Sequence, residues 1–583
     1  MSELDSLKSS TDALLHEFSD RVNGMKGRGE YGVLIRRLDG GAAAKSATEF
    51  FGEGEFTAVG IDGSMDQNET LEMLLFYVNA MAYGCPFTVS ASGVSFHGER
   101  IRKMDSVGAS NAVPLWLEDL SSVAGRKDDV ESETDYNATL TEISFSMMLM
   151  AELGAAARAL DRADVRLLFL DRPVSGSFQS LSRDLRFLVR SHESALEGLH
   201  GGGLWRDLFL LGAVPLSSAP PARHGPYLLH DVVRRMLQGE GFGTASSGLP
   251  VKSAAYVKRK LQDVDREGAL FEPGTDALTE EAKGFRKRLA KLAESVTSRF
   301  FEGGEYPLKH GGRWLRTRDL NVVNLILLTS LIERSARDRK LLVGVTKDTG
   351  STDVSRSVLG MLDVPAGLRP GMRHDRIMFT ILSAVNEGLF VPPWRSVSYD
   401  SCFATLVPNG EAVGGETPPL RAARKVASRE RLFVKSFFQT RASEKTIFRS
   451  PVFLYDRPYS PEHDGAWCED VRYVERGEVQ TASPYLEREG SNGFDNMVLH
   501  LLSVSDHPEV FESYGHNILL YMADKAAKAD VKMKKGFLLG MVNLKLTPLA
   551  RHEKLFSVIR RYRDARAAFE QARSDEAARY APD

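Results

Sequence analysis

Two short apolar runs in the chain each end in an aspartate. The run AVGI precedes Asp62, and the run VRLLFL precedes Asp171. Such runs are typical of buried strands, and a carboxylate at the end of a buried strand requires a cation, hydrogen-bond donors or water. The alternative for Asp62 is a turn cap, because the small residues Gly63 and Ser64 follow it. We expect the chain to turn sharply at these two residues, leaving room beside the acid for a phosphate backbone.

The elements between the two aspartates decide whether their carboxylates meet. Alternating apolar residues at 87–96 predict an antiparallel strand, and apolar residues at helical spacing predict a helix over 136–160. The resulting order of strand, hairpin, helix and strand places the two acids at matching edges of one sheet. RNase H-like nucleases bring distant carboxylates together in this way. The sequence therefore predicts an α/β fold with an RNase H-like mixed sheet flanked by helices.

A third carboxylate is expected from the helix. Glu142 and Glu152 are the candidates, and Glu152 is preferred because it lies nearer the second strand and has small neighbours. For either glutamate the alternative is an ordinary solvent-facing helix position. Grouped carboxylates suit phosphodiester hydrolysis, because hard oxygen ligands hold Mg²⁺ or Mn²⁺ ions that activate water and stabilise charge on phosphate oxygens.

Four short blocks, taken in order, resemble the NurA nuclease family. They are IDGS at Asp62, the helix glutamate before LLFLDRP, the strand VGVTKD, and the late segment GHNILLYMADKAAK. The resemblance implies an RNase H/Piwi-like core, a homodimer, dependence on Mn²⁺, and degradation of DNA together with a HerA-type hexameric ATPase that translocates DNA. It also implies that Asp62, Glu152 and Asp171 are metal ligands.

The late block departs from the family at one position. The family has Ala-His where this chain has Ala523-Asp524, so the resemblance implies that Asp524 replaces an imidazole ligand with a carboxylate. Both groups bind Mn²⁺, and an additional carboxylate favours harder ions. The alternative for Asp524 is an ion pair with Lys525 or Lys528 on the helix surface.

Basic residues are candidates for contact with DNA, because affinity comes from backbone charge and aromatic rings hold unpaired bases. Arg172 follows Asp171 where the family usually has glycine, and it is expected either to hold a scissile phosphate or to neutralise the acids. Lys347 has the same two roles open to it, phosphate contact or a strand-end ion pair. A further cluster at 309–318 is either a DNA contact or ordinary solvated surface. Its chosen members are Arg313, Trp314 and Arg316.

The length of 583 residues predicts two or three structural units. We divide the chain into an N-terminal helical segment (1–55), a first half of the nuclease core (56–175), a helical insertion (176–340), a second half of the core (341–545) and a C-terminal helical tail (546–583).

Composition excludes some classes of protein. The three cysteines are widely separated, which argues against a disulfide framework or a cysteine zinc site, and the net charge of -3 neither indicates nor excludes a nucleic-acid partner. No apolar run is long enough to span a membrane, and no secretory signal is visible, so a cytoplasmic location without membrane association is expected. The stretch GGAAAKS at 40–46 lacks the glycine that precedes the lysine of a P-loop, which is consistent with ATP hydrolysis by a partner.

These observations predict a Mn²⁺- or Mg²⁺-dependent deoxyribonuclease that works in DNA end processing, repair or antiviral defence. Two alternatives have the same fold. One is a catalytically degenerate scaffold that binds DNA ends or a partner, and the other is a metal-dependent RNA nuclease.

Overall fold

The computed structural model describes residues 3–552 apart from several internal segments. The undescribed segments are 71–72, 115–132, 215, 218–227, 266–269, 303–307, 311, 363, 365–371, 373, 402–405, 411, 416–417, 419, 423–430, 443–448, 476 and 507–513. The predicted tail therefore lies outside the described residues beyond His552, and the five-segment division of the chain stays a prediction.

A mixed sheet forms the centre of the protein. In the described residues it has eleven strands in the order β1-β10-β14-β15-β9-β6-β2-β3-β4, with β11 paired to β14 and β5 paired to β3. These strands are β1 (Ile35–Arg37), β2 (Gly54–Thr70), β3 (Met73–Ser90), β4 (Gly93–Phe96), β5 (Arg102–Pro114), β6 (Val165–Leu170), β9 (Leu341–Thr346), β10 (Trp394–Ser396), β11 (Tyr399–Asp400), β14 (Phe433–Gln439) and β15 (Phe453–Pro458). A smaller sheet contains β12 (Leu406–Pro408), β13 (Leu420–Ala422), β16 (Val471–Glu475) and β17 (Glu478–Ala482).

The strand order near β2 is that of an RNase H-like core. β2 and β3 form a long antiparallel hairpin, β5 pairs with the other edge of β3, and β2, β6 and β9 run parallel to one another. A helix, α4 (Glu133–Asp161), connects β5 to β6. The predicted order of strand, hairpin, helix and strand is confirmed, as is the α/β class with helices flanking a mixed sheet.

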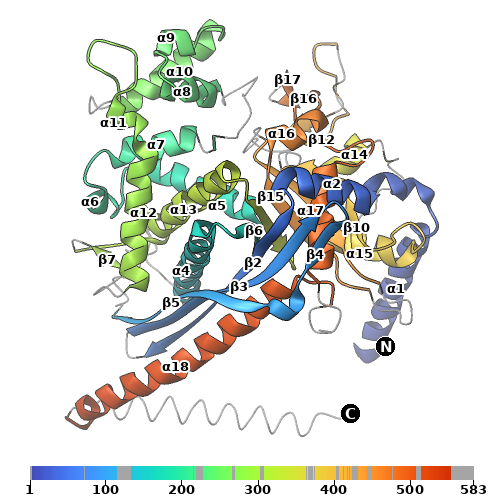
Figure 1. Cartoon of the computed structure of the whole chain (residues 1–583), viewed down its shortest axis with the longest axis horizontal. Coiled ribbons are helices and arrows are strands. Elements are labelled where there is room, and N and C mark those ends of the chain that lie inside the picture. Colours follow the sequence, from blue (N-terminus) through green and yellow to red (C-terminus); the bar gives the residue numbers. More distant parts are fainter. Residues whose placement is uncertain are drawn as a thin grey trace.

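Helices cover both faces of this core (Figure 1). Leu168 and Leu170 of β6 pack in the core that contains α4, whereas Leu167 and Phe169 pack in the core that contains α17 (Gly493–Val504) and the start of α18 (Ile518–His552). This alternation is expected of a strand buried on both faces.

The helix α4 contains a stretch that is long and apolar enough to cross a membrane. Within the described residues it is the one such stretch, Thr139–Asp161, and 72% of its apolar window is buried inside the protein. Its apolar surface is covered by the sheet and by α13, so it is the central helix of a packed core.

A largely helical insertion joins β6 to β9 and stacks beside the sheet (Figure 1). Its helices are α5 (Val174–Ser191), α6 (Glu197–His200), α7 (Leu204–Ala213), α8 (Leu228–Leu237), α9 (Phe242–Ala245), α10 (Val251–Val264), α11 (Glu280–Lys283), α12 (Phe285–Phe301) and α13 (Thr317–Arg337). The short hairpin of β7 (Lys309–His310) and β8 (Arg313–Trp314) precedes α13. The remaining helices are α1 (Glu3–Gly24), α2 (Gly40–Phe51), α14 (Leu359–Met361), α15 (Asp375–Val385) and α16 (Pro461–Asp464).

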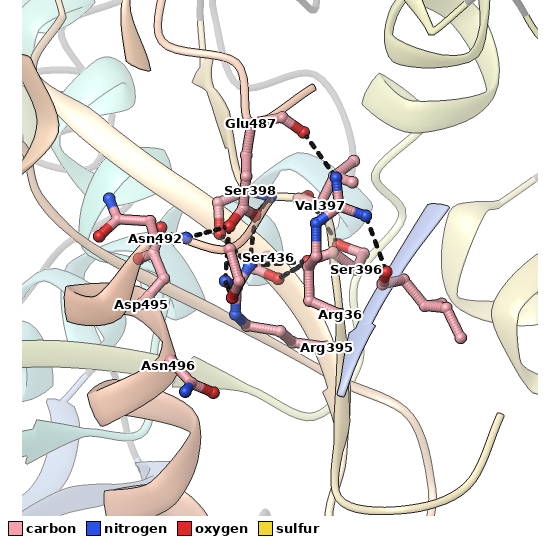
Figure 2. A network of polar contacts seen from close by, with 12 residues as sticks. Arg36, Arg395, Ser396, Val397, Ser398, Ser436, Glu487, Asn492, Asp495 and Asn496 are labelled. Atoms are coloured by element: carbon pink, nitrogen blue, oxygen red, sulfur yellow. Dashed lines mark hydrogen bonds and ion pairs between the residues drawn. The ribbon is translucent and has the colours of Figure 1, made fainter. Parts of the chain in front are cut away.

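A buried ion pair holds the second half of the sheet to the segment before α17. Arg395 of β10 donates two hydrogen bonds to Glu487, at 2.5 and 2.7 Å, and both side chains are fully buried. The Glu487 carboxylate also accepts from the backbone N–H groups of Ser398 and Asn492 (Figure 2). Because every oxygen of this carboxylate is paired, the charge is tolerated away from water.

Candidate active site

The carboxylates of Asp62 and Asp171 meet where β6 ends. Ile61 pairs with Leu170 in the parallel ladder, and the Asp171 N–H donates to the Ile61 carbonyl at 3.2 Å. The two acids therefore lie side by side on neighbouring strands, and their side chains share a hydrogen bond. Asp62 is only 8% exposed, so this pair is almost removed from water.

The chain does not turn after Asp62, and that expectation was wrong. β2 continues to Thr70 and stays paired with β3, with Ser64 opposite Asn79. The small residue at position 63 makes room for a carboxylate instead of a phosphate. A Cβ atom at Gly63 would lie 2.5 Å from Oε1 of Glu152, so the glutamate occupies the space beside the strand.

Glu152 of α4 is the third acid of this group. It is 2% exposed and lies against Gly63, whose N–H donates to Oδ1 of Asp62 at 2.8 Å. Its charge acts to raise the pKa of Asp62. Glu142 is exposed and lies ten residues earlier on the same helix, about 15 Å away along its axis. The structure thus brings Glu152, and not Glu142, to the two aspartates.

Two cations are paired with the acids. Lys347 follows β9, and its Nζ lies 2.6 Å from Oδ2 of Asp171. Arg172 forms an ion pair with Glu152 and places its guanidinium group 5.5 Å from the centre of the Phe145 ring. Of the two roles open to each cation, the structure shows the pairing with an acid. Asp62, Glu152, Asp171, Lys347 and Arg172 are called the acid cluster below.

The acid cluster contains three carboxyl groups and two cations, and burial shifts the pKa values of its members. Burial, together with the charges of Asp171 and Glu152, raises the pKa of Asp62 to about 10. Burial also raises the pKa of Glu152, although Arg172 opposes the change. For Lys347, burial acts to lower the pKa, but the charge and hydrogen bond of Asp171, together with the charges of Asp62 and Asp524, outweigh burial and the pKa is raised. Asp62 is consequently protonated at neutral pH unless another cation enters.

Two further groups lie near the cluster: Asp524 on α18, and His516 just before this helix begins. Asp524 bonds Lys528 on the same helix, with Nζ 2.7 Å from Oδ1, and its charge acts on both Lys347 and His516. The helix α18 can pack closely against β2 because position 60 of this strand is a glycine. A Cβ atom at Gly60 would lie 2.5 Å from Cβ of Leu519. Asp524 therefore forms the ion pair that was its alternative role, while lying within electrostatic reach of the acids.

Sequence reasoning missed His516. This residue is 7% exposed, and burial, together with the charge of Lys347, lowers its pKa to about 4. Its Nδ1 lies 3.1 Å from the carbonyl of Asn517, which can only accept, so Nδ1 carries the proton. Nε2 then has a free lone pair and no hydrogen-bond partner among the described residues. Its place in the GHNI block, just before the helix start, was the available signal.

The remaining candidates for DNA contact lie on the insertion. Arg313 and Trp314 form β8, and the ammonium group of Lys309 lies 4.9 Å from the centre of the Trp314 ring. Arg316 pairs with Glu193 at 3.1 Å and caps the start of α13. The structure thus gives Arg316 an acidic partner within the insertion.

No group of three histidine, cysteine, aspartate or glutamate side chains within the described part of the chain is arranged to hold a metal ion. In the acid cluster the ammonium and guanidinium groups stand beside the carboxylates, where they supply positive charge. The donors nevertheless have the chemistry that a hard divalent ion prefers, and the buried Nε2 of His516 is unpaired there.

The fold and the cluster define an α/β protein with buried carboxylates at the edge of an RNase H-like sheet. No family model and no curated protein matches the chain. Among solved structures, the chain is similar to the NurA nuclease from Sulfolobus solfataricus, with 10% identity, a TM-score of 0.39, and coverage of 94% of this chain and 98% of that one. It is also similar to a structure of NurA with manganese, with 11% identity, a TM-score of 0.35, and coverage of 91% and 98%. The predicted resemblance to NurA is confirmed as a match along most of the chain.

Proposed function

We propose that this protein is a metal-dependent nuclease that hydrolyses phosphodiester bonds of DNA. One observation carries the proposal, which is the convergence of Asp62, Glu152 and Asp171 from two strands and a helix onto one buried point. Keeping three carboxylates together away from water is costly, and a fold retains such an arrangement when it serves a site. Burial, together with the charges of Asp171 and Glu152, raises the pKa of Asp62 to about 10, which shows how costly a third ionised carboxylate is at this point.

Asp62, Glu152, Asp171 and Asp524 are the residues that would hold Mn²⁺ or Mg²⁺, with His516 next to them. When bound, such an ion supplies an activated water and stabilises charge on the phosphate oxygens. The donor set fits a hard divalent ion, because it consists of carboxylate oxygens with one free imidazole nitrogen.

Lys347 and Arg172 have a second task in this proposal. Each is paired with a carboxylate in this structure, and each carries donors that suit a phosphate group. With Asp171 and Glu152 engaged in holding a divalent ion, the ammonium group of Lys347 and the guanidinium group of Arg172 would be free to hold the scissile phosphate.

The partners belong to the same proposal. The sequence resemblance supports a homodimer that works with a HerA-type hexameric ATPase on DNA ends or invading DNA in the cytoplasm. The stretch at 40–46 supports a separate ATPase, because Gly40–Phe51 forms a helix capped by Asp39 and lacks the glycine spacing of a P-loop.

The test is degradation of labelled DNA by the purified protein with Mn²⁺, alone and with the ATPase. Asp62→Ala and Asp171→Ala should each lower cleavage at least about 100-fold. The matched control is Asp66→Ala, because Asp66 lies on the same strand but pairs with Lys535 at 2.7 Å; it should retain activity. A protein that binds DNA and never cuts it is the scaffold alternative. Preferential cleavage of a matched RNA strand would indicate the RNA nuclease.

A further inference from the structure

The helix α5 leads directly away from the acid cluster. It begins at Val174, two residues after Arg172, and its exposed face carries Arg183, Arg186 and Arg190. The spacing of three and four residues places these arginines along one face of the helix. Among the described residues none of the three guanidinium groups has a hydrogen-bond or ion-pair partner. They form a positive stripe along α5, with Asp184 as the acidic residue between Arg183 and Arg186.

A first hollow of about 460 Å³ adjoins this helix on the side nearer the cluster. It lies between α4, α5 and α13, and Arg183 and Arg318 contribute to its wall. Phe145 also lines it and contacts the guanidinium group of Arg172, so the hollow lies next to the Arg172 ion pair with Glu152.

A second hollow of about 650 Å³ lies at the far end of α5. Its lining includes Arg186 and Arg190 from the positive stripe, and Lys260 from α10. Partly exposed Trp205 also lines it, with its ring centre 5.1 Å from that of His192. Cations beside an accessible aromatic ring form the combination that binds the phosphates and bases of a single strand.

We propose that α5 guides single-stranded DNA from the acid cluster into the pocket at Trp205. This inference rests on the proposed nuclease function and identifies where its substrate lies. At about 1.5 Å per helical residue, Val174 and Arg190 are about 24 Å apart along the helix, so the bound strand spans several nucleotides. A single strand is favoured over a duplex because the ring of Trp205 stacks only on a base whose face is free.

The experiment measures binding of a labelled 20-mer oligo(dT) to the full chain across a range of salt concentrations, with EDTA present so that nothing is cut. Arg186→Ala/Arg190→Ala should weaken binding about tenfold or more. It should also reduce the salt slope by about 1.4, since each phosphate contact on a single strand contributes about 0.7. The matched control is Lys287→Ala/Lys291→Ala, which removes two exposed cations at the same spacing from α12.

Trp205→Ala should weaken binding by about 5- to 100-fold without changing the salt slope, because stacking involves no counterion release. Trp205→Phe, which keeps an aromatic ring, should restore most of the affinity. The proposal is overturned if both double variants weaken binding equally, if neither does, or if duplex DNA or oligo(rU) binds more tightly than oligo(dT).

The binding measurement and the cleavage assay test the DNA path and the nuclease activity separately. If binding depends on Arg186, Arg190 and Trp205 but the protein never cuts DNA with Mn²⁺, the DNA path is supported and the nuclease activity is contradicted. If the protein cuts DNA with Mn²⁺ but its DNA binding does not depend on these residues, the nuclease activity is supported and the DNA path is contradicted.

Discussion

Gly63 and Glu152 are in such close contact that any side chain at position 63 requires its neighbours to shift. A Cβ atom there would lie 2.5 Å from Oε1 of Glu152 and 2.8 Å from Cγ of Met148. Gly63→Ala should therefore displace the Glu152 carboxylate and lower cleavage about 10- to 100-fold, because small misplacements of a catalytic group are costly. The assay compares initial rates at saturating Mn²⁺.

Gly154→Ala is the control for this substitution. Its Cβ atom would meet only Val107, at 3.9 Å, so activity should be unchanged and α4 slightly stabilised. Equal rates for Gly63→Ala and the parent protein would show that the position of Glu152 does not matter for cutting.

The raised pKa of Asp62 predicts a pH dependence of stability in the metal-free protein. A carboxyl group that titrates near pH 4 when unfolded and near pH 10 when folded keeps a proton that the unfolded chain releases. Stability is therefore lost as the pH rises between these values, by up to about 1.4 kcal/mol per pH unit. Urea unfolding at pH 6, 7 and 8 should show this slope relative to Asp62→Asn, which cannot titrate. Parallel curves for the two proteins would contradict the charge state assigned to Asp62.

Arg172 is predicted to stabilise the metal-free cluster by neutralising Glu152. Both side chains are more than nine-tenths buried, and removing one partner of a buried pair costs about 3–5 kcal/mol. Arg172→Met should lower the melting temperature, and Mn²⁺ should raise it more in this variant than in the parent protein. Arg334→Met is the comparison, because Arg334 pairs with the exposed Asp161 and its loss should cost little. A variant that Mn²⁺ fails to stabilise would exclude a cation site at Glu152.

The Arg395 ion pair predicts a loss of stability that leaves the chemistry intact. Glu487→Ala leaves the fully buried guanidinium group of Arg395 without its partner, and should lower the free energy of unfolding measured in urea by about 3–5 kcal/mol. Cleavage per folded molecule should stay unchanged at low temperature, because the pair supports β10 and α17 and does not contact the acid cluster. A large fall in that specific activity would mean that this network positions the site.

The sequence predicts those parts of the site that depend on local pattern. Asp62 and Asp171 were predicted because each ends or interrupts an apolar run, and periodicity alone places a helix with Glu152 between them. Gly63 was misread because small residues after an aspartate favour a turn locally, whereas pairing with β3 and the contact with Glu152 are long-range. Nothing local connects Arg395 with Glu487, which lies 92 residues away, or indicates that His516 is buried beside Lys347.

The most direct test of the central claim is a crystal of this protein grown with Mn²⁺ and measured at a wavelength where manganese scatters anomalously. The account predicts an anomalous peak within coordination distance of Asp62 and Asp171, with Glu152 turned toward it and Lys347 moved away from Asp171. A fully ordered cluster with no peak, and with Lys347 still on Asp171, would contradict it.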